Sequence, residues 1–375
     1  MEQGRPRRPT VSDVARRAGV SVATAGRALG DYGYVGEQTR ERVLAMAREL
    51  GYSPNVVARS MRSGSTRSIG FVGSDIANPY FAEAMRGICD VAHLEGYETI
   101  LTNSDERLDL EQLAVRTLLD KQVEGLVVAP ASVTHCDHLA DARAEGVPVV
   151  LLDRDLPQLD CDSVVVDNEN AAYAAVTHLL KLGHERIGLL ASINATEQPE
   201  IRPADGDGRW VVLGADRPSV ERIRGYLRAL AEHGAPVSRD AITWIVAGQA
   251  AEADAAARRL LNSPWRPTAV FATDNESTRR IFLAAKTEGF KVPDRVSLLG
   301  FDDLDWTVMV EPQISVVAQS PLLMGRMAGE RLFARIKGDD QPKRRIVLPT
   351  QLIIRASTGT RAEQEGPECT VASRR

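Results

Sequence analysis

The sequence after residue 68 alternates short apolar runs with longer amphipathic stretches, and this alternation restricts the fold more than any other feature. The apolar runs that we predict as strands are 69–73, 98–102, 125–129, 147–152, 163–166, 186–190, 241–246, 269–272 and 296–300. Predicted helices lie between most of them, over 79–94, 111–121, 170–182, 217–232, 251–261, 277–288 and 321–336. Such alternation, with strands that are apolar throughout, is typical of a parallel sheet covered by helices on both faces. We therefore predict an α/β fold and, because about 290 residues exceed one typical domain, two sheets.

Residues 10–51 have a different pattern, which predicts three short helices. Thr10 can cap the first helix, with Asp13 as its capping-box partner. Gly19 can end that helix and Ser21 can cap the next one, so that only a short turn separates the two. The second and third predicted helices cover 22–29 and 37–50. This spacing is typical of a helix-turn-helix, whose second helix enters the major groove of DNA.

The start of the second helix carries side chains suited to DNA contacts. Arg27 can form a bidentate contact with a guanine edge, whereas Val22 and Ala23 offer apolar contacts, for example to a thymine methyl group. Ser21 and Thr24 suit phosphate oxygens. The candidate DNA-contacting residues of this segment are Thr10, Ser21, Val22, Ala23, Thr24, Arg27 and Tyr34. The alternative is an ordinary three-helix domain whose arginines are only solvated.

The charge distribution agrees with a DNA contact in this segment. The whole chain has a net charge of −5, which by itself argues against a nucleic-acid binder. Residues 1–68, however, carry 12 Lys and Arg against 6 Asp and Glu, a net charge of +6, and the remainder carries −11. A basic N-terminal part on an acidic body points to a nucleic-acid or membrane-surface contact that is confined to the basic part. The basic stretch 56–63 is too short for a stable helix by itself, which suits a linker that folds on binding.

Three segments carry a specific resemblance: TVSDVARRAGVSVATAGRALG, TRERVLAMARELGYSPNVVARSMRSG and IGFV. Together they resemble the lactose-repressor family of bacterial transcription regulators. The resemblance continues to about Gly359 through NPYFAEAMRGI, EGLVVAP, GVPVVLLDRD, VVVDNENAAYAAVTHLLKLGHERIGLL, AVFATDNES, VPDRVSLLGFDD, PQISVV and LPTQLIIRASTG. It implies an α/β chain with an N-terminal three-helix helix-turn-helix head and a periplasmic-binding-protein-like core of two Rossmann-like lobes.

The resemblance also implies domain limits. A helix-turn-helix head covers residues 1–54, a hinge helix or linker 55–68, an effector-binding and dimerisation core 69–360, and a disordered tail 361–375. Within the core, lobe 1 takes about 69–167 and 299–330, and lobe 2 about 168–298 and 331–360. Asn55 and Ala58 fall on hinge positions close to the backbone. Met61 falls on the position of the apolar wedge that enters the minor groove and kinks the DNA.

Effector contacts are likewise implied by the resemblance, at loops that follow strands. Arg222 matches the arginine of the family's R-x-x-G-Y/F segment, and Asp302 is the first aspartate of GFDD. The candidate effector-binding residues are Asn78, Tyr80, Phe81, Asp153, Arg222, Asp274, Asp302 and Trp306. An arginine and several carboxylates around an aromatic ring suit polyhydroxyl ligands or a purine. Alternatively, Asp153, Asp303 and Asn168 cap loops or bridge the lobes.

The sequence departs from the family pattern in several places, which include Gly30 and Gly36, where the family has Asn and a Ser cap. Gly26 lies inside the second helix, at a cost of about 1 kcal/mol relative to Ala. Residues 191–220 include about twenty extra residues rich in Pro, Gly and Asp, which predict an exposed, mobile loop next to the cleft mouth. Trp210 in this loop either contacts the cleft as part of a lid or belongs to a flexible insertion without such a role. Arg279 stands where the family has Gly, at the cleft floor or the dimer face.

No motif for metal, cofactor or catalytic chemistry stands out, so we expect no metal, no cofactor and no enzyme activity. The four cysteines form no C-x-x-C pair, and His135-Cys136-x-His138 has no second ligand cluster. The patterns G-x-S-x-G, H-E-x-x-H, G-x-G-x-x-G and the Walker loop are missing. The N-terminus has no secretory signal and no run of about 18 apolar residues could span a membrane. We therefore expect a cytoplasmic, nucleoid-associated protein without a membrane partner.

These expectations combine into a homodimeric, sequence-specific DNA-binding transcription regulator, most often a repressor in this family. Its partners would be a pseudo-palindromic double-stranded DNA operator and a small-molecule effector in the interlobe cleft: a sugar, a polyol, or a nucleobase or nucleoside. The effector can shift DNA binding only through its different affinity for two states. Two alternatives remain: a solute-binding protein, for which the head is superfluous, and a sugar-active enzyme on the same core, for which catalytic residues are missing.

Overall fold

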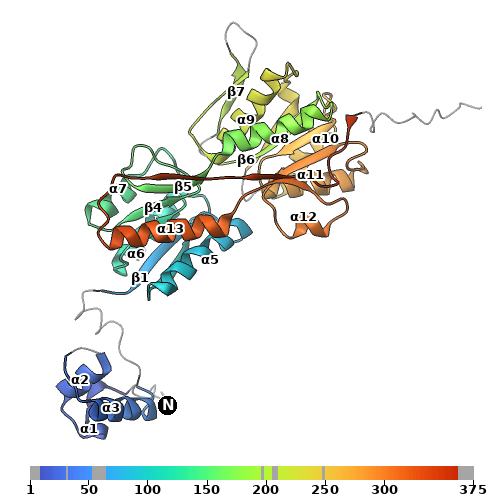
Figure 1. Ribbon diagram of the computed structural model, residues 1–375. Helices are drawn as coiled ribbons and strands as arrows, with labels where there is room; N and C mark the ends of the chain where they lie inside the picture. Colours follow the sequence, from blue (N-terminus) through green and yellow to red (C-terminus); the bar gives the residue numbers. More distant parts are fainter. Residues whose placement is uncertain are drawn as a thin grey trace, which may run out of the picture. The chain divides into compact units, whose positions relative to one another are not determined.

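The computed structural model describes residues 9–30, 33–52, 65–195, 198–204, 210–246 and 250–361. The candidate hinge residues Asn55, Ala58 and Met61 lie outside these ranges, as do residues 362–375 of the predicted tail. The chain divides into two compact units, residues 1–67 and 68–375, and each is described by itself (Figure 1).

The described part of the first unit consists of the helices α1 (Val11–Ala18), α2 (Val22–Gly30) and α3 (Glu37–Glu49). The predicted capping box of α1 is present, because Thr10 Oγ1 accepts from the Asp13 N–H and the Asp13 carboxylate accepts from the Thr10 N–H. Gly19 ends α1 with a φ of 67°, a left-handed conformation that favours glycine. The three helices pack around Val14, Ala15, Ala18, Ala25, Ala28, Val43 and Ala47.

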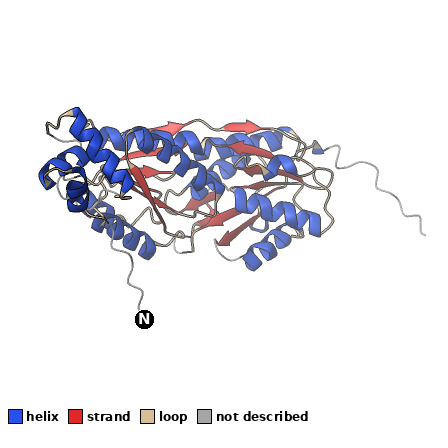
Figure 2. Cartoon of the chain, turned by 90° about the horizontal axis from the view of Figure 1, so that it is seen from below, coloured by secondary structure: helices blue, strands red, loops and turns tan. Residues whose placement is uncertain are grey.

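Lobe 1 of the second unit has a six-stranded parallel sheet in the order β13-β5-β4-β3-β1-β2. Helices, drawn in blue, cover the strands of this unit, drawn in red (Figure 2). Its strands are β1 (Ser68–Gly73), β2 (Glu98–Asn103), β3 (Leu126–Val128), β4 (Val149–Leu152), β5 (Asp162–Val166) and β13 (Arg345–Leu348). One face is covered by α5 (Pro79–Leu94) and α13 (Pro321–Ile336), the other by α6 (Leu108–Asp120) and α7 (Asp137–Ala144). The inner strands β1, β3, β4 and β5 are buried along their whole length, which explains their continuous apolar runs.

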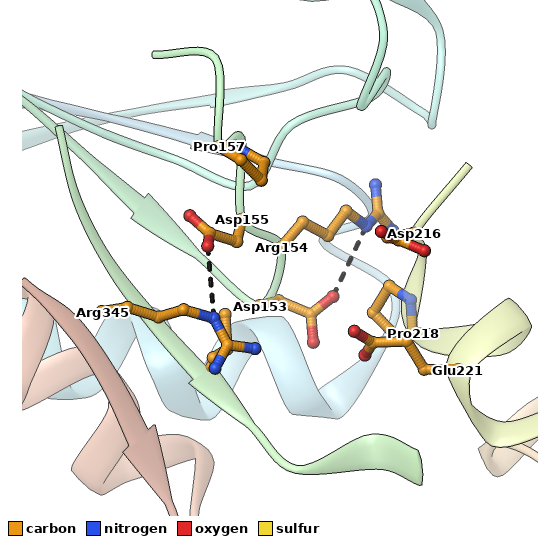
Figure 3. Close-up of a pocket in the computed structure, with 9 residues that line it drawn as sticks. Asp153, Arg154, Asp155, Pro157, Asp216, Pro218, Glu221 and Arg345 are labelled. Carbon is orange, nitrogen blue, oxygen red and sulfur yellow. Dashed lines mark ion pairs between the residues drawn. The ribbon is translucent and has the colours of Figure 1, made fainter. Parts of the chain in front are cut away.

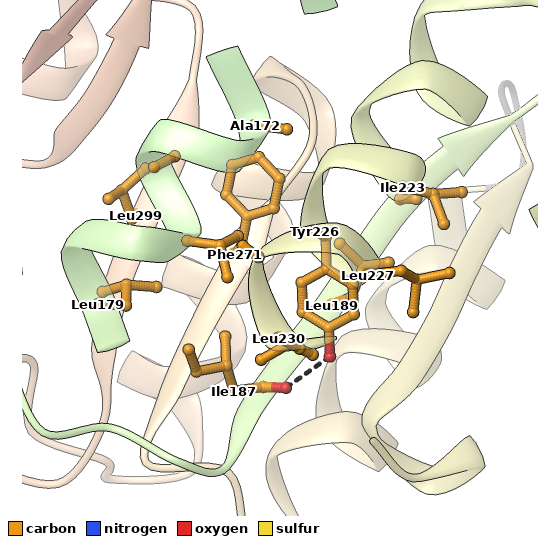
Figure 4. Close-up of a cluster of buried hydrophobic side chains, with 14 of the residues drawn as sticks. Ala172, Leu179, Ile187, Leu189, Ile223, Tyr226, Leu227, Leu230, Phe271 and Leu299 are labelled. Carbon is orange, nitrogen blue, oxygen red and sulfur yellow. Dashed lines mark hydrogen bonds between the residues drawn. The ribbon is translucent and has the colours of Figure 1, made fainter. Parts of the chain in front are cut away.

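Lobe 2 repeats this architecture with the order β14-β12-β11-β10-β6-β9, in which only β14 is antiparallel. Its strands are β6 (Ile187–Ile193), β9 (Ile242–Val246), β10 (Ala269–Ala272), β11 (Ser297–Phe301), β12 (Ser315–Ala318) and β14 (Gln351–Ile353). Its helices are α8 (Asn168–Lys181), α9 (Pro218–Glu232), α10 (Ala250–Leu261), α11 (Asn275–Thr287), the short α12 (Trp306–Met309) and the 3₁₀ turn η1 (Arg239–Ala241). On the α8–α9 face, the buried Tyr226 hydroxyl donates to the Ile187 carbonyl over 2.8 Å (Figure 4). The predicted α/β fold class is confirmed.

The lobe limits within the core differ from the prediction, which puts residues 299–330 in lobe 1 and 331–360 in lobe 2. Strands β11 and β12 instead belong to the lobe 2 sheet, whereas α13 and β13 complete lobe 1. The chain therefore crosses between the lobes after β5, after β12 and after β13. The prediction is wrong because a strand's partners are distant in sequence, so the pattern of a strand does not say which of two sheets it joins.

The prediction of an exposed loop over 191–220 is also wrong for its described part. Strand β6 continues to Ile193, and the antiparallel strands β7 (Glu200–Pro203) and β8 (Trp210–Leu213) follow. Ile201 and Val212, one from each strand, are buried in the lobe 2 core, and Trp210 packs against the same core. Alternating apolar residues in this segment carry the signal, but the surrounding Pro, Gly and Asp conceal it.

Two sequence motifs have plain structural explanations. His138 Nε2 lies 2.8 Å from an oxygen of the buried Glu111 carboxylate, and His135 Nδ1 lies 2.9 Å from the Thr134 hydroxyl. In the described ranges no group of three or more His, Cys, Asp and Glu is placed to hold a metal ion. Arg279 pairs at the surface with Glu276 of its own helix. None of the helices in the described ranges is both long and apolar enough to cross a bilayer.

Candidate functional sites

The exposed face of α2 carries most of the candidate DNA-contacting side chains. Val22, Ala23 and Arg27 are exposed there, while Ala25 and Ala28 are buried against α1 and α3. This division follows from the helical period, which places the two sets on opposite sides. The exposed set is therefore available to an external partner.

Among the polar candidates of the head, some side chains cap helices and one is exposed to solvent. Ser21 Oγ accepts from the Thr24 N–H over 3.1 Å and lies 2.8 Å from the Thr24 hydroxyl, so the two side chains cap α2 together. The Thr10 hydroxyl lies 2.7 Å from Asp13 Oδ2, inside the capping box of α1. Tyr34, by contrast, is 91% exposed. Helix N-termini such as that of α2 are themselves favourable for phosphate.

The two lobes present an aspartate in the same local geometry. Asp153 directly follows β4 and Asp302 directly follows β11. Both have left-handed backbones, with φ of 69° and 72°. Each donates its N–H over 2.9 Å to the neighbouring strand, Asp153 to Val164 and Asp302 to Val317. Ligands of parallel sheets bind at these strand ends, so the two carboxylates mark where the lobes face one another.

In lobe 1, Asp153 is paired with Tyr80. The Tyr80 hydroxyl donates to Asp153 Oδ1 over 2.9 Å and lies 3.1 Å from the sulfur of Met324. Burial raises the pKa of Tyr80, and Asp153 raises it further, so the hydroxyl remains a neutral donor. Asn78 caps α5 by accepting from the Tyr80 N–H, and Phe81 is buried in the lobe 1 core. Local structure therefore accounts for Asn78 and Phe81.

In lobe 2, Arg222 of α9 is buried over the face of the Phe301 ring, 3.7 Å from its centre. Its Nε donates to Asn168 Oδ1 over 2.8 Å and its Nη1 to the Thr273 carbonyl over 2.6 Å. From the sequence, Asn168 is considered only as a structural residue, and Phe301 is one apolar position among many in a strand. Here both hold the guanidinium in place.

Asp302 lies close to this guanidinium. Its Oδ1 accepts from Gln319 Nε2 over 2.6 Å, and its Oδ2 accepts from the Asn275 N–H over 3.3 Å. Burial raises the pKa of Asp302, and the charge of Arg222 opposes this increase only in part. Sequence reasoning misses Gln319, because β12 before it appears there only as part of a resembling segment. A polar residue directly after a strand is the signal that could have found it.

The other two candidates of lobe 2 serve the packing of that lobe. Asp274 caps α11: its Oδ1 accepts from the Ser277 N–H, and its Oδ2 accepts from the Ser192 N–H. Trp306 Nε1 donates to Asn275 Oδ1 over 2.8 Å. In sequence, an aspartate that caps a helix and an aspartate that binds a ligand look alike, because both follow a strand.

Four of the eight candidates thus lie within electrostatic reach of one another across the two lobes. The pKa of Tyr80 in lobe 1 is raised by the charge of Asp302 and lowered by that of Arg222, both in lobe 2, which places them within electrostatic reach of one another. Together with Asp153, these side chains offer a hydroxyl donor, a guanidinium donor and two carboxylate acceptors. Such a set suits a ligand that both donates and accepts hydrogen bonds.

A cavity of about 210 Å³ adjoins these residues between the lobes (Figure 3). Lobe 1 contributes Asp153, Arg154, Asp155, Pro157, Val165 and Arg345, and lobe 2 contributes Asp216, Pro218 and Glu221. Burial raises the pKa of Glu221, which accepts from Asn168 Nδ2 over 2.9 Å. Asn168 therefore connects this cavity with Arg222. Four carboxylates and the two guanidiniums of Arg154 and Arg345 line the cavity, and Arg345 pairs with Asp155.

The raised pKa of Asp302 gives a prediction for stability. A carboxyl whose pKa is raised by folding stabilises the folded state below its ordinary pKa, 3.8, and this contribution is lost as pH rises through the folded pKa. We expect wild type to gain stability relative to Asp302→Asn as pH falls from neutral towards about 4. The measurement is the free energy of unfolding by urea of both proteins across this range.

A matched control is the neighbouring Asp303. Burial raises the pKa of Asp303, but its hydrogen bond from Arg355 lowers it overall. Asp303 therefore titrates below this pH range. Across the range, the free energy of unfolding of Asp303→Asn should differ from that of wild type by a constant amount. A stability difference for Asp302→Asn that is constant, or that moves in favour of the variant as pH falls, would contradict the assignment.

Comparison with known protein families covers nearly the whole chain. Residues 10–55 match the family "Bacterial regulatory proteins, lacI family". Residues 66–207 match "Periplasmic binding proteins and sugar binding domain of LacI family", and residues 176–358 match "Periplasmic binding protein-like domain". The matches follow the observed division into a helical head and a two-lobed core.

Full-length relatives give the same result. Catabolite control protein A of Priestia megaterium is 33% identical over 351 residues, which are 93% of this chain and 99% of that protein. The HTH-type transcriptional repressor PurR of Photobacterium profundum is 30% identical over 353 residues, 93% of this chain and 98% of the relative. Among solved structures, the lac repressor dimer bound to operator and the anti-inducer ONPF matches with a TM-score of 0.78 and 24% identity. That match covers 94% of this chain and 100% of the other, and it shows a common fold.

Proposed function

We propose a function from one premise: this chain belongs to the lacI family of bacterial regulatory proteins. It is accordingly a DNA-binding transcription regulator of the repressor type with a periplasmic-binding-protein-like core, and not an enzyme. We infer that it binds a pseudo-palindromic operator as a homodimer and that a small molecule between the lobes controls this binding. The observation that carries the proposal is the joint site of Tyr80 and Asp153 from lobe 1 with Arg222 and Asp302 from lobe 2.

The roles of the chain's parts follow from this proposal. Residues 1–54 read the operator through the exposed face of α2, with Arg27 at a guanine edge. Residues 55–68 form the hinge, and Met61 enters the minor groove. Residues 69–360 bind the effector and dimerise. A solute-binding protein, the alternative, is not favoured because residues 10–55 match a regulator family of their own.

A homodimer accords with the surface of the core. Large apolar side chains remain exposed on α11, α12 and the start of α13: Leu283, Val308, Met309, Leu322 and Leu323. Met309 is 77% exposed. Covering these side chains with a second copy would remove apolar area from water, at about 25 cal/mol per Å².

The proposed effector is a sugar, a polyol, or a nucleobase or nucleoside. Its hydroxyl or amino groups would donate to Asp153 and Asp302, and its oxygens would accept from Arg222. The family description of residues 66–207 as a sugar-binding domain supports the same class.

Operator binding is tested with the full chain and Arg27→Ala. DNA selected from a random pool by the wild-type protein serves as the probe in gel-shift titrations at several salt concentrations. Loss of one bidentate base contact should weaken binding to the selected DNA about ten- to hundredfold, with a smaller loss on unrelated DNA. The thermal unfolding midpoint should stay unchanged because Arg27 is exposed.

Arg48→Ala is the matched control, since it removes the same charge from exposed α3, where Arg48 Nε donates to the Leu44 carbonyl. Equal losses for both variants would show that Arg27 contributes charge alone. Failure of the full chain to select any DNA would overturn the proposed function itself.

A further inference from the structure

The segment between β6 and α9 contacts lobe 1 at both of its ends, although it belongs to lobe 2. At its start, Asn194 Nδ2 donates to the backbone carbonyl of Glu106 over 3.0 Å. At its end, Arg217 Nη2 donates to Glu106 Oε2 over 2.6 Å, and Arg217 Nη1 donates to the Ala131 carbonyl over 2.8 Å. Glu106 follows β2 and Ala131 follows β3, so all three contacts cross from one lobe to the other.

Burial and charge make these contacts strong. The Arg217 side chain is only 4% exposed and that of Glu106 21%. The same carboxylate also accepts from Arg154 of lobe 1, so it receives one guanidinium from each lobe. Burial raises the pKa of Glu106, but the two arginines lower it overall, which keeps the carboxylate ionised. Hydrogen bonds between ionised partners are about twice as strong as neutral ones.

Between its two ends, the described part of the segment is anchored to both lobes. Ile201 and Val212 are buried in the lobe 2 core, as described above. Ala215 packs against the lobe 1 cluster that includes Val133 and Leu156. The Arg217 N–H donates to the Ala215 carbonyl over 2.8 Å, which fixes the approach of the Arg217 side chain to Glu106.

We infer that Arg217 and Asn194 are positioning residues that clasp the two lobes together through Glu106 without any ligand. Arg217 lies between Asp216 and Pro218, which line the cavity together with Glu221, opposite Asp153. The clasp therefore sets the distance between the two walls of that cavity. Its regulatory meaning rests on the proposed function: the clasp favours the lobe arrangement seen here in the ligand-free chain, so the effector acts on an equilibrium that these contacts already bias.

The substitution Arg217→Gln removes the guanidinium that donates to Glu106 and to the Ala131 carbonyl. Glu106 keeps its ion pair with Arg154, so no buried charge is left without a partner, which is the costly outcome in such sites. Arg224→Gln is the matched control. Arg217 directly precedes α9 and Arg224 lies inside this helix, where it pairs with Asp216 and the Gly214 carbonyl, both within lobe 2.

Hydrogen–deuterium exchange of the full chain, measured by mass spectrometry without DNA or added ligand, tests the clasp. In Arg217→Gln we expect amide exchange to rise about tenfold in both lobes, at 104–107 and 130–133 of lobe 1 and at 192–195 and 215–217 of lobe 2. In Arg224→Gln we expect a rise at 214–217 alone. Exchange in β3 and β10 should be unchanged in both variants.

An increase confined to lobe 2 in Arg217→Gln, or an equal increase in both lobes in Arg224→Gln, overturns the inference. If Arg217→Gln fails to fold, Asn194→Ala replaces it, because this variant removes the neutral hydrogen bond to the Glu106 carbonyl and should give a smaller rise in the same segments of both lobes. No rise in lobe 1 for Asn194→Ala overturns the inference as well. Because the measurement needs neither operator nor effector, its failure leaves the gel-shift test of the proposed function unaffected.

Discussion

Replacing Arg222 with methionine is expected to lower the free energy of unfolding by about 3 kcal/mol and to abolish ligand binding. The guanidinium is buried, and its removal leaves Asn168 Oδ1 and the Thr273 carbonyl without their donor. Methionine fills much of the same volume over the Phe301 ring, so the expected loss comes from the polar partners and not from a cavity. It also removes the positive charge that opposes the raised pKa of Asp302, so that carboxyl becomes harder to ionise.

Two measurements check this expectation. Urea unfolding gives the change in stability, and thermal shift against a panel of sugars, polyols and nucleosides gives ligand binding. Any compound that stabilises the wild-type protein should leave the variant unaffected. Stability and thermal shifts equal to those of wild type would contradict the assigned role of Arg222.

Arg228→Met is the matched control for Arg222. Arg228 lies in the same helix and also stacks on an aromatic ring, that of Tyr173, but it is partly exposed at the surface. Surface ion pairs and exposed cation–π contacts each contribute about 1 kcal/mol or less. We expect this variant to lose no more than about 2 kcal/mol in total and to retain the ligand shifts of wild type.

Gly325→Ala is expected to cost more than about 4 kcal/mol or to prevent soluble expression. Gly325 lies in α13 where this helix crosses α5, and a Cβ atom there would come within 1.8 Å of the Ala84 carbonyl oxygen. The opposing Gly87 is equally confined, since its Cβ would lie 2.2 Å from the Leu322 carbonyl oxygen. Because the two helix backbones are in direct contact, neither can move aside locally to make room for a Cβ atom. The helices must therefore separate, which exposes the lobe 1 core.

The control for this prediction is Gly329→Ala, one turn further along α13. Its Cβ would lie 3.1 Å from the Val91 side chain, which can shift by a few tenths of an ångström. We expect a loss of about 1 kcal/mol, measured by urea unfolding of both variants. Similar losses for the two substitutions would show that the crossing of α5 and α13 is looser than the structure indicates.

Local features of the fold were predictable because their causes are local. The helices 79–94 and 321–336 were predicted with the bounds that α5 and α13 have, since a proline begins each of them and an apolar stripe runs through each. The capping box at Thr10 is another local feature that the pattern identified. Lobe membership was not predictable, because β11 and β13 find their partners far along the chain.

The residues of the candidate site were likewise predictable only in part. Tyr80, Asp153, Arg222 and Asp302 follow strands or begin helices at positions that the resemblance marked, and the structure brings them together. The network around them depends on side chains from distant segments, such as Asn168 between Arg222 and Glu221. A sequence does not show that one amide serves two partners, since this depends on the packing of α8 against α9.

The order of the strands has a consequence for synthesis on the ribosome. Lobe 1 begins at residue 68, but its helix α13 and its edge strand β13 belong to the last part of the chain. Lobe 2 is contiguous from α8 to β12, so most of it leaves the ribosome before lobe 1 can be completed. The helical head, whose described residues end at 52, is available to fold first. The unfinished lobe 1 must therefore leave the apolar face that α13 later covers, over β3, β4 and β5 beside α5, exposed until translation is nearly finished, and transiently exposed apolar surface of this kind favours aggregation.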